Sequence, residues 1–416
     1  MDRIAIIGAG ISGLSAGRIL GKIHDVEIFD RAGKPGGLVK CDRIQDNLFH
    51  KVGGHIFNSK NQAVLDWFWG FFDRDREFLK ARRNAKILLN GKWIGYPLEN
   101  YLFQLDKGFI SKVLDDFLSP DYQPKDPFSY PNFAEFLKSN FGTTLYETYF
   151  RPYNEKIWNA DLSTIPLAWL EGKLPMPNLK EMLLSNIAKE EETGMVHSTF
   201  YYAKEDGSQF IANRLAEGMK IHYHTDIQKI EKREGKFWLD QNGPFDKVVY
   251  TGDVRKAGHI FGEKMVPAGL QQSLTSLPSN GTSNLFCETD PGDISWLYLP
   301  DPHVKAHRII YTGTFAESNN RGSQRQTCVV EFSGDYSYEF MCEEAKKLPG
   351  NLKPLAFNKE PNSYILHAMG SKALVDEVRS MLRQEKVFLL GRFAEWEYYN
   401  MDKAIEAAMT LAEEMD

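Results

Sequence analysis

The chain opens with an apolar strand, a glycine-rich turn, a helical run and a second strand, and this order constrains the fold more than any other feature. Residues 3–7 (RIAII) predict a buried parallel strand, residues 8–13 (GAGISG) a turn, residues 14–23 a helix, and residues 26–29 a strand that ends at Asp30. In this arrangement the glycines permit a tight turn, close approach to a pyrophosphate and close helix–strand packing. The helix N-terminus then faces the phosphates. The predicted dinucleotide contacts are Gly8, Gly10, Ile11, Ser12, Gly13 and Asp30, with the Asp30 carboxylate accepting from a ribose hydroxyl.

The segment after Asp30 favours FAD over NAD. It contains Arg31 and the pair Gly36-Gly37, followed by Leu38, and it resembles the flavoprotein superfamily that includes the amine oxidases. In that superfamily the paired glycines pass close to FAD, whereas the alternative is a plain surface turn. Residues 386–390 predict a strand, and Gly391-Arg392 then leads to a helix over residues 401–415. Such a C-terminal segment returns to the flavin in the superfamily, so Gly391, Arg392, Asn400, Met401 and Asp402 are expected to contact it; a simple closing strand and helix is the alternative.

The rest of the pattern predicts an α/β protein with three parts. Residues 1–60, 200–260 and 385–416 are expected to form a discontinuous Rossmann-like FAD-binding domain. Helix-like apolar spacing in residues 61–199 predicts an inserted helical domain. Short strand-like runs over residues 261–384 predict an antiparallel β-sheet substrate domain. Without a second dinucleotide fingerprint, we expect no separate NAD(P) domain.

Composition excludes several classes. The net charge is −6 and there is no long basic run, so a nucleic-acid partner is not expected. The four cysteines have neither metal-ligand spacing nor the density of a disulfide framework, which favours a reducing, cytoplasmic location and no metal site. The apolar run at the N-terminus is too short for a signal peptide or a membrane span.

Several stretches narrow the superfamily. They are residues 53–57 (GGHIF), 91–100 (GKWIGYPLEN), 151–158 (RPYNEKIW), 169–173 (WLEGK), 296–300 (WLYLP), Arg308, and 391–398 (GRFAEWEY). In this order they resemble the UDP-galactopyranose mutase family, within the amine oxidase and protoporphyrinogen oxidase-like flavoproteins. The resemblance spans essentially the whole chain and is greatest to the eukaryotic-type branch of the family, whereas residues 399–402 look more like the bacterial-type ending.

The resemblance implies an isomerase that uses FAD in its reduced form. These mutases interconvert the pyranose and furanose forms of a nucleotide sugar, with UDP-galactopyranose and UDP-galactofuranose as the first expectation here. They act through a covalent adduct between the reduced flavin N5 and the sugar. NAD(P)H is expected as the transient reductant of the flavin. The expected biological process is polysaccharide biosynthesis. The resemblance leaves a homo-oligomer open.

The resemblance also carries residue roles. Arg308 and Lys173 are expected to hold the substrate diphosphate, and His55, after Gly53-Gly54, to lie beside the flavin; these three form the predicted catalytic set. Tyr153, Trp158, Tyr298, Tyr364 and Tyr398 are expected to bind substrate, each with a packing role as the alternative.

Two positions depart from the family pattern. Lys173 stands where an arginine is usual, and a lysine lacks the bidentate fork. Phe315 stands where a tyrosine is usual. Arg82 and Arg83 are interpreted as a solvated pair, with a contact to the flavin or nucleotide as the alternative. These departures leave two other hypotheses open: an FAD-dependent oxidase or desaturase of the amine oxidase and protoporphyrinogen oxidase type, and a non-catalytic flavin-bearing binding protein.

Overall fold

A five-stranded parallel sheet forms the first structural layer. The computed structural model describes residues 1–126, 129–167, 178–189 and 199–415. The strands lie in the order β19-β13-β1-β2-β9, and every neighbouring pair is parallel. Their bounds are β1 (Arg3–Ile7), β2 (Asp25–Phe29), β9 (Lys220–His222), β13 (Lys247–Tyr250) and β19 (Val387–Leu389). The sheet therefore joins strands from the two ends and the middle of the chain.

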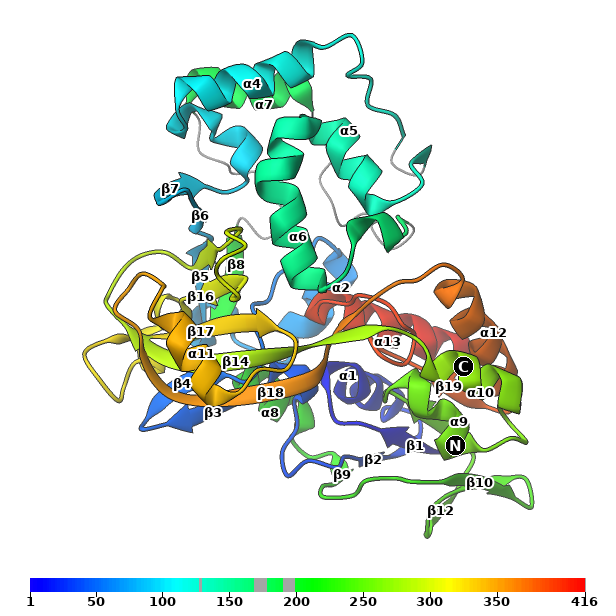
Figure 1. The fold of residues 1–416 in the computed structure, drawn as a ribbon. Helices are drawn as coiled ribbons and strands as arrows, with labels where there is room; N and C mark the ends of the chain where they lie inside the picture. The colour runs from blue at the N-terminus through cyan, green and yellow to red at the C-terminus, as the bar shows by residue number, and fades with distance from the viewer. Residues whose placement is uncertain (127–128, 168–177, 190–198, 416) are drawn as a thin grey trace.

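Helices from both ends of the chain cover this sheet. Helix α1 (Ile11–Leu20) packs against the C-terminal helix α13 (Met401–Met415), and both appear beside the parallel strands in Figure 1. Their shared core contains Ile6, Leu14, Val249 and Ile405, each at most 1% exposed. Further elements of this region are α2 (Gln62–Trp69), α8 (Gly207–Ala216), α9 (Ala257–Phe261), α10 (Ala268–Thr275), α12 (Ser371–Gln384) and the antiparallel β10 (Ile230–Arg233), β11 (Lys236–Leu239) and β12 (Asn242–Phe245).

A seven-stranded sheet forms the second layer, in the order β18-β14-β17-β16-β15-β6-β7. Its strands are β14 (Ser279–Thr289), β15 (Trp296–Tyr298), β16 (Arg308–Ile310), β17 (Gln326–Ser333), β18 (Lys353–Ile365), β6 (Ala85–Leu89) and β7 (Lys92–Gly95). All neighbouring pairs are antiparallel except β15 with β6, which is parallel. The sheet is thus mixed, and its β6–β7 hairpin comes from the part of the sequence expected to be helical. Helix α11 (Tyr338–Ala345) packs on it.

A helical layer lies against one end of this sheet (Figure 1). It contains α4 (Lys107–Leu118), α5 (Phe133–Leu145), α6 (Arg151–Trp158) and α7 (Leu179–Ala188), with a π-helical turn (Tyr146–Phe150) before α6. Its apolar face joins the sheet in one core, in which Phe133, Leu145 and Ile87 are nearly fully buried. Two short antiparallel pairs, β3 (Cys41–Ile44) with β4 (Asn47–His50) and β5 (Phe78–Arg82) with β8 (Thr199–Ala203), connect the layers. A one-turn helix, α3 (Arg74–Glu77), directly precedes β5.

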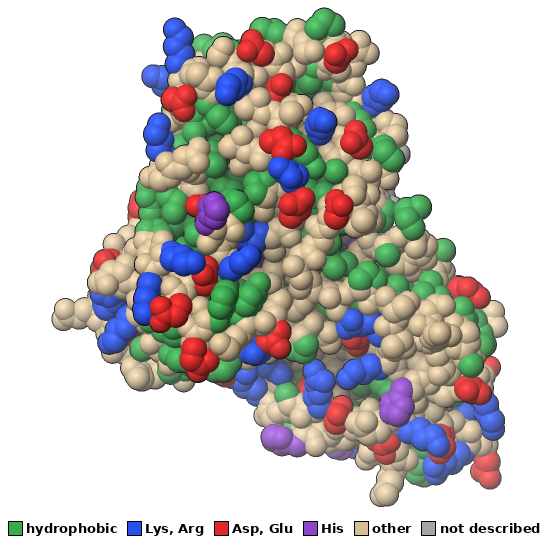
Figure 2. Space-filling view, viewed as in Figure 1, with side chains coloured by type: hydrophobic (Ala, Val, Ile, Leu, Met, Phe, Trp, Pro, Cys, Tyr) green, Lys and Arg blue, Asp and Glu red, His purple; other side chains and the backbone are tan. Residues whose placement is uncertain are grey.

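The surface charges, the helices and the cysteines of the described residues bear on the expectations from composition. On the face drawn in Figure 2, acidic and basic side chains are interspersed rather than separated by sign. No helix in the described part of the chain is long and apolar enough to cross a membrane. The described residues contain no cluster of side chains arranged to hold a metal ion. The four cysteines are free thiols.

Candidate functional site

One cavity of about 880 Å³ is lined by residues of both main sheets. Its wall includes Ile7, Phe29 and Tyr250, the last residues of β1, β2 and β13, so it opens at the carboxyl ends of the parallel strands. Ligands of doubly wound sheets bind at this edge. The same cavity also reaches Tyr298, Arg308 and other residues of the seven-stranded sheet. Its volume is in the upper part of the range of about 300–1,000 Å³ typical of ligand pockets.

The glycine turn has the geometry of a dinucleotide cradle. Gly8 has φ +104°, which L side chains rarely adopt, and a Cβ on Gly13 would lie 2.0 Å from the Gly8 carbonyl oxygen. The turn packs against a second glycine turn, because Gly10 forms a bridge with Gly36. Helix α1 has no side-chain cap at Gly10, so its first backbone N–H groups can bind an anion.

Most of the predicted cofactor contacts line this cavity. They are Gly8, Gly10, Ile11, Ser12, Asp30, Arg31, Gly36, Gly37, Leu38, Gly53, Gly54, His55, Arg392, Asn400, Met401 and Asp402. Gly13 and Gly391 are not among the lining residues; Gly391 has φ +97°, and a Cβ there would lie 2.5 Å from Ser12 Oγ. These two glycines allow close packing around the cradle. The N-termini of α1 and α13 both border the cavity, which suits a pyrophosphate.

Asp30 has a structural contact beyond the one predicted. Its Oδ2 accepts from the Ala9 backbone N–H at 2.6 Å, and its Oδ1 accepts from the Ala32 N–H at 2.7 Å. The carboxylate therefore fixes the glycine turn to the end of β2. Each carboxylate oxygen can accept more than one hydrogen bond, so a ribose hydroxyl remains compatible with this geometry.

His55 lies on the cavity wall with its ring buried. Its Nε2 has no hydrogen-bond partner among the residues that the structure describes, and its backbone N–H donates to Nδ1 of His50 at 3.3 Å. Burial, reinforced by the charge of Arg392, lowers the pKa of His55 to about 4, so the ring is neutral at neutral pH. A neutral ring with one free nitrogen can lie against a flavin and exchange one hydrogen bond with it. The glycine cradle, the two helix termini and this histidine together fit FAD.

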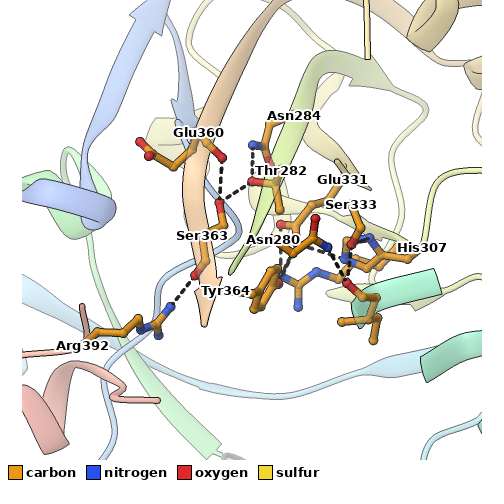
Figure 3. Close-up of polar contacts among 12 residues, drawn as sticks. Asn280, Thr282, Asn284, His307, Glu331, Ser333, Glu360, Ser363, Tyr364 and Arg392 are labelled. Carbon is orange, nitrogen blue, oxygen red and sulfur yellow. Dashed lines mark hydrogen bonds and ion pairs between the residues drawn. The ribbon is translucent and has the colours of Figure 1, made fainter. Parts of the chain in front are cut away.

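A row of polar side chains crosses the seven-stranded sheet. Tyr298 on β15 pairs in register with Arg308 on β16, and Arg308 pairs with Glu331 on β17. Nη2 of Arg308 donates to both Glu331 oxygens, at 2.8 and 3.0 Å, and to Tyr364 Oη at 2.9 Å. Tyr364 Oη donates to Glu331 at 2.8 Å. Figure 3 shows Tyr364, Glu331 and His307 joined in this network. The sheet register therefore places these groups at the cavity.

Aromatic rings extend this row on both sides. Tyr398 stacks on Tyr364, with ring centroids 6.1 Å apart, and Arg392 lies 4.4 Å above the Tyr398 ring. Tyr153 meets Tyr298 edge to face at 5.5 Å, and Trp158 meets Tyr364 at 5.9 Å. The predicted substrate residues Tyr298, Arg308, Tyr364 and Tyr398 thus line one cavity. Tyr153 and Trp158 pack against them but are not among its lining residues.

Glu331 is a site residue that the sequence analysis missed. It is 0% exposed, and His307 Nε2 lies 2.9 Å from its Oε1. Burial alone would raise the pKa of Glu331, but the Arg308 charge and the His307 hydrogen bond hold it far below its usual range. The signal in the sequence was a lone acidic residue within the apolar run of residues 328–332 (CVVEF).

Arg83 corrects the interpretation of Arg82 and Arg83 as a solvated pair. Arg82 is exposed, but Arg83 lines the cavity, and its Nη2 donates to Tyr298 Oη. Phe315 is 2% exposed and packs against Trp296, with ring centroids 4.9 Å apart, so it lies in the core and not on the cavity wall. Lys173 lies outside the described residues.

Comparisons with known proteins agree with this geometry. A family profile described as an NAD(P)-binding Rossmann-like domain matches residues 6–73. The probable UDP-galactopyranose mutase of Klebsiella pneumoniae is 23% identical over 425 aligned residues, which cover 99% of this chain and 94% of that protein. A crystal structure of reduced UDP-galactopyranose mutase has a TM-score of 0.88 at 18% identity, over 100% of this chain and 94% of that chain. The predicted resemblance to UDP-galactopyranose mutases is confirmed. The dTDP-fucopyranose mutase of Escherichia coli is 27% identical over 190 residues, 42% of this chain and 46% of that protein.

Proposed function

We propose that this protein is a flavin-dependent nucleotide-sugar mutase that interconverts pyranose and furanose forms, with UDP-galactopyranose and UDP-galactofuranose as the first substrate pair. The observation that carries the proposal is the continuity of one cavity. The dinucleotide cradle around Gly8–Gly13 and the donor row around Arg308 border the same space. A sugar diphosphate bound at the row would therefore lie next to a cofactor bound in the cradle.

The cofactor would supply an electron-rich nitrogen nucleophile when bound as reduced FAD. The protein's part is to hold the leaving diphosphate and stabilise its charge. Among the described residues, the contacts of Arg308 all use Nη2, so Nε and Nη1 are left for a ligand. These two nitrogens point to different edges of the guanidinium plane, and each can donate to a ligand oxygen.

Tyrosine hydroxyls complete the donor set. Burial raises the pKa of Tyr364 well above its usual value, so its hydroxyl keeps its proton at neutral pH. It donates to Glu331 and so holds the row in place, whereas the Tyr298 hydroxyl accepts from Arg83 and can donate its own O–H to a phosphate oxygen. Tyr298, Tyr364 and Tyr398 all reach the cavity, as does Trp296, so aromatic rings border the space beside Arg308. Lys173 is proposed as a further diphosphate contact, on the resemblance alone.

The direct test is turnover of the reduced protein. Dithionite-reduced enzyme is incubated with UDP-galactofuranose, and the pyranose product is measured by chromatography, with the oxidised enzyme as control. A panel with a dTDP-linked 6-deoxysugar covers the second mutase type among the relatives. Absence of interconversion with every nucleotide sugar would overturn the proposal. Flavin reduction by an amine or a cyclic alkene, with peroxide release, would support the oxidase alternative instead.

Arg308→Ala isolates the substrate contact. We expect nucleotide-sugar binding to weaken by roughly 2–5 kcal/mol, as for truncation of a desolvated charged partner. Arg321→Ala is the matched control, because Arg321 is an exposed arginine paired with Glu205. Flavin content, read from the visible absorbance, shows that both variants fold. Equal binding in both variants would remove Arg308 from the site.

A further inference from the structure

The charge of Arg308 is already matched within the sheet. Glu331 accepts two hydrogen bonds from its guanidinium and is 0% exposed. The low pKa of Glu331 keeps the carboxylate ionised, and burial lowers the pKa of the neighbouring His307, so that ring is neutral. Arg308 therefore offers hydrogen-bond donors to a ligand but adds almost no net positive charge to the cavity.

A bound diphosphate needs more than donors. Its negative charge is costly to move from water into a closed cavity unless a cation compensates it. Because the charges of Arg308 and Glu331 cancel, another positively charged group must face the cavity to compensate the charge of the diphosphate. Arg83 and Arg392 both line the cavity without a carboxylate partner among the described residues, and Arg83 is the one hydrogen-bonded to the row of Arg308.

Arg83 lies next to the donor row. It precedes β6, which pairs with β15, and Ala85 lies in register with Trp296. Its Nη2 donates to Tyr298 Oη, and Tyr298 is the register partner of Arg308. Both arginines line the same cavity. Tyr298 therefore connects the two guanidinium groups along one wall.

The surroundings of Arg83 keep its charge uncompensated. Its guanidinium carbon lies 4.9 Å from the Tyr96 ring centroid, 5.3 Å from Trp296 and 5.9 Å from Tyr298. No carboxylate in residues 1–126, 129–167, 178–189 and 199–415 forms an ion pair with it. Its Nε is buried without a hydrogen-bond partner. Aromatic faces stabilise a cation by about 0.5–2 kcal/mol each but do not neutralise it.

A purely structural role would leave this arrangement unexplained. A buried arginine that only fills space normally has a carboxylate or several carbonyls around its five N–H donors. Among the described residues the partners of Arg83 are tyrosine hydroxyls and not carboxylates, and one side of the guanidinium faces the cavity. The rings hold the guanidinium in place while leaving donors for an anion.

We propose that Arg83 supplies the net positive charge that binds the diphosphate of the nucleotide-sugar substrate, alongside the remaining hydrogen-bond donors of Arg308. This inference rests on the proposed function and adds a residue to its substrate site. It assigns the two arginines different tasks: Arg308 fixes the geometry of the phosphate oxygens, and Arg83 compensates their charge.

The test compares nucleotides with and without the diphosphate. Binding of UDP and uridine to the flavin-loaded, reduced protein is measured by calorimetry for the wild type, Arg83→Met and Arg83→Lys, with dTDP and thymidine in parallel. Arg82→Met is the matched control, since it removes the same charge from the exposed neighbour. Flavin content and circular dichroism report folding. Should the Met variant not fold, Arg83→Gln, which also removes the charge, is read in the same way, while the Lys variant keeps the charge but not the planar guanidinium.

We expect Arg83→Met to weaken diphosphate binding at least about 30-fold, the lower end for loss of a desolvated charge partner, with uridine affinity unchanged. Arg83→Lys should fall between the wild type and the Met variant, and Arg82→Met should match the wild type. An unchanged ratio of UDP to uridine affinity in the Met variant, or in the Gln variant where the Met variant does not fold, would overturn the role of Arg83. A wild-type protein that binds no nucleoside diphosphate would overturn the proposed function itself.

Discussion

At the scale of single residues, the buried carboxylate of Glu331 ties the binding row to folding stability. Replacing it by Gln keeps its shape but leaves the Arg308 charge without a partner. We expect Glu331→Gln to lower the free energy of unfolding at neutral pH by about 3–5 kcal/mol, the usual cost of breaking a buried pair. Urea unfolding measures this, and Glu317→Gln, outside the cavity lining, is the control. A loss below about 0.5 kcal/mol, the usual range for surface substitutions, would contradict the pairing.

The same carboxylate predicts a pH dependence. Its pKa in the folded protein is far below the unfolded value of about 4.3, so its stabilisation is fully present above that value. It is lost as the pH falls below about 4.3 toward the folded pKa. Glu331→Gln should therefore lose less stability than the wild type on acidification through this window. Parallel acid-unfolding curves for the two proteins would contradict this.

A second pH window belongs to His50. It is 0% exposed, its Nε2 lies 2.8 Å from Tyr202 Oη, and burial lowers its pKa to about 3. In the unfolded chain a histidine takes up a proton near pH 6.5, so stability should fall below that pH by about 1.5 kcal/mol by pH 5. His55, with a pKa lowered to about 4, adds to the fall in the same direction. Urea unfolding at several pH values measures the slope. His50→Gln should flatten it, and exposed His303→Gln should not.

The adjacent arginines show where prediction from the sequence ends at this scale. Arg82 and Arg83 have the same chemistry and the same local context. Successive side chains of an extended segment face opposite ways, but only the pairing of β6 with β15 decides which one meets the cavity. Arg308 and Tyr398 could be assigned in advance because a longer motif surrounded each. Glu331 had no motif, only an unusual place in an apolar run.

At the scale of elements, helix α1 contains one glycine that contacts the backbone of the cofactor turn, Gly13, and one that contacts only core side chains, Gly17. A Cβ on Gly13 would lie 2.0 Å from the Gly8 carbonyl oxygen, whereas a Cβ on Gly17 would meet the flexible end of Met219 at 2.3 Å. Backbone cannot yield as a side chain can. We therefore expect Gly13→Ala to abolish flavin retention during purification and Gly17→Ala to retain it. Visible absorbance of the purified proteins checks this, and full flavin content in Gly13→Ala would contradict the close approach.

Helix α6 depends on a lysine rather than on its aromatic residues alone. Lys156 Nζ donates to the carbonyls of Leu299 and Asp301 at 2.6 Å each, and so fixes the helix to the loop between β15 and β16. Lys156→Met should cost about 1–3 kcal/mol of stability, the usual range for buried charged hydrogen bonds. It should also speed hydrogen exchange in residues 151–158 and 299–306. Lys112→Met, on the exposed face of α4, should do neither; protection in residues 151–158 equal to the wild type would contradict the tether.

Local pattern predicted some elements closely and missed others. The helix expected at residues 401–415 is α13, which follows the Gly391-Arg392 segment, and the strand expected at 26–29 is β2 (Asp25–Phe29), which the glycine-turn unit and Asp30 marked. Strand β18 (Lys353–Ile365) was missed, since it contains two prolines and alternates in polarity on an exposed face. Its long pairing with β14 is a tertiary effect that no local window contains.

At the scale of the whole molecule, the cavity is the place where the two sheets meet. Its wall contains residues from the N-terminal turn, the middle of the chain and the segment before α13. The sequence can predict that each segment lies near a ligand. Whether Arg308 on β16 shares a cavity with the glycine turn at Gly8 depends on how the two sheets pack. This is why each cofactor segment could be predicted from its own glycine motif, whereas the way the segments and the substrate wall meet could not.

This arrangement predicts that cofactor binding stabilises the molecule as one unit. FAD in the cradle would contact α1, the Gly53–His55 turn and the N-terminus of α13, which belong to different parts of the chain. A ligand at 100 times its dissociation constant adds about 2.7 kcal/mol to the folded state, provided it does not bind the unfolded chain. We expect the flavin-free protein to unfold at lower temperature, and FAD to restore the higher transition in proportion to the logarithm of its concentration. Addition of UDP to the reduced holoprotein should raise it again, and Arg308→Ala should lose only this second increase. Differential scanning calorimetry measures both steps, and a transition temperature independent of FAD would show that the cavity does not hold the cofactor that joins its walls.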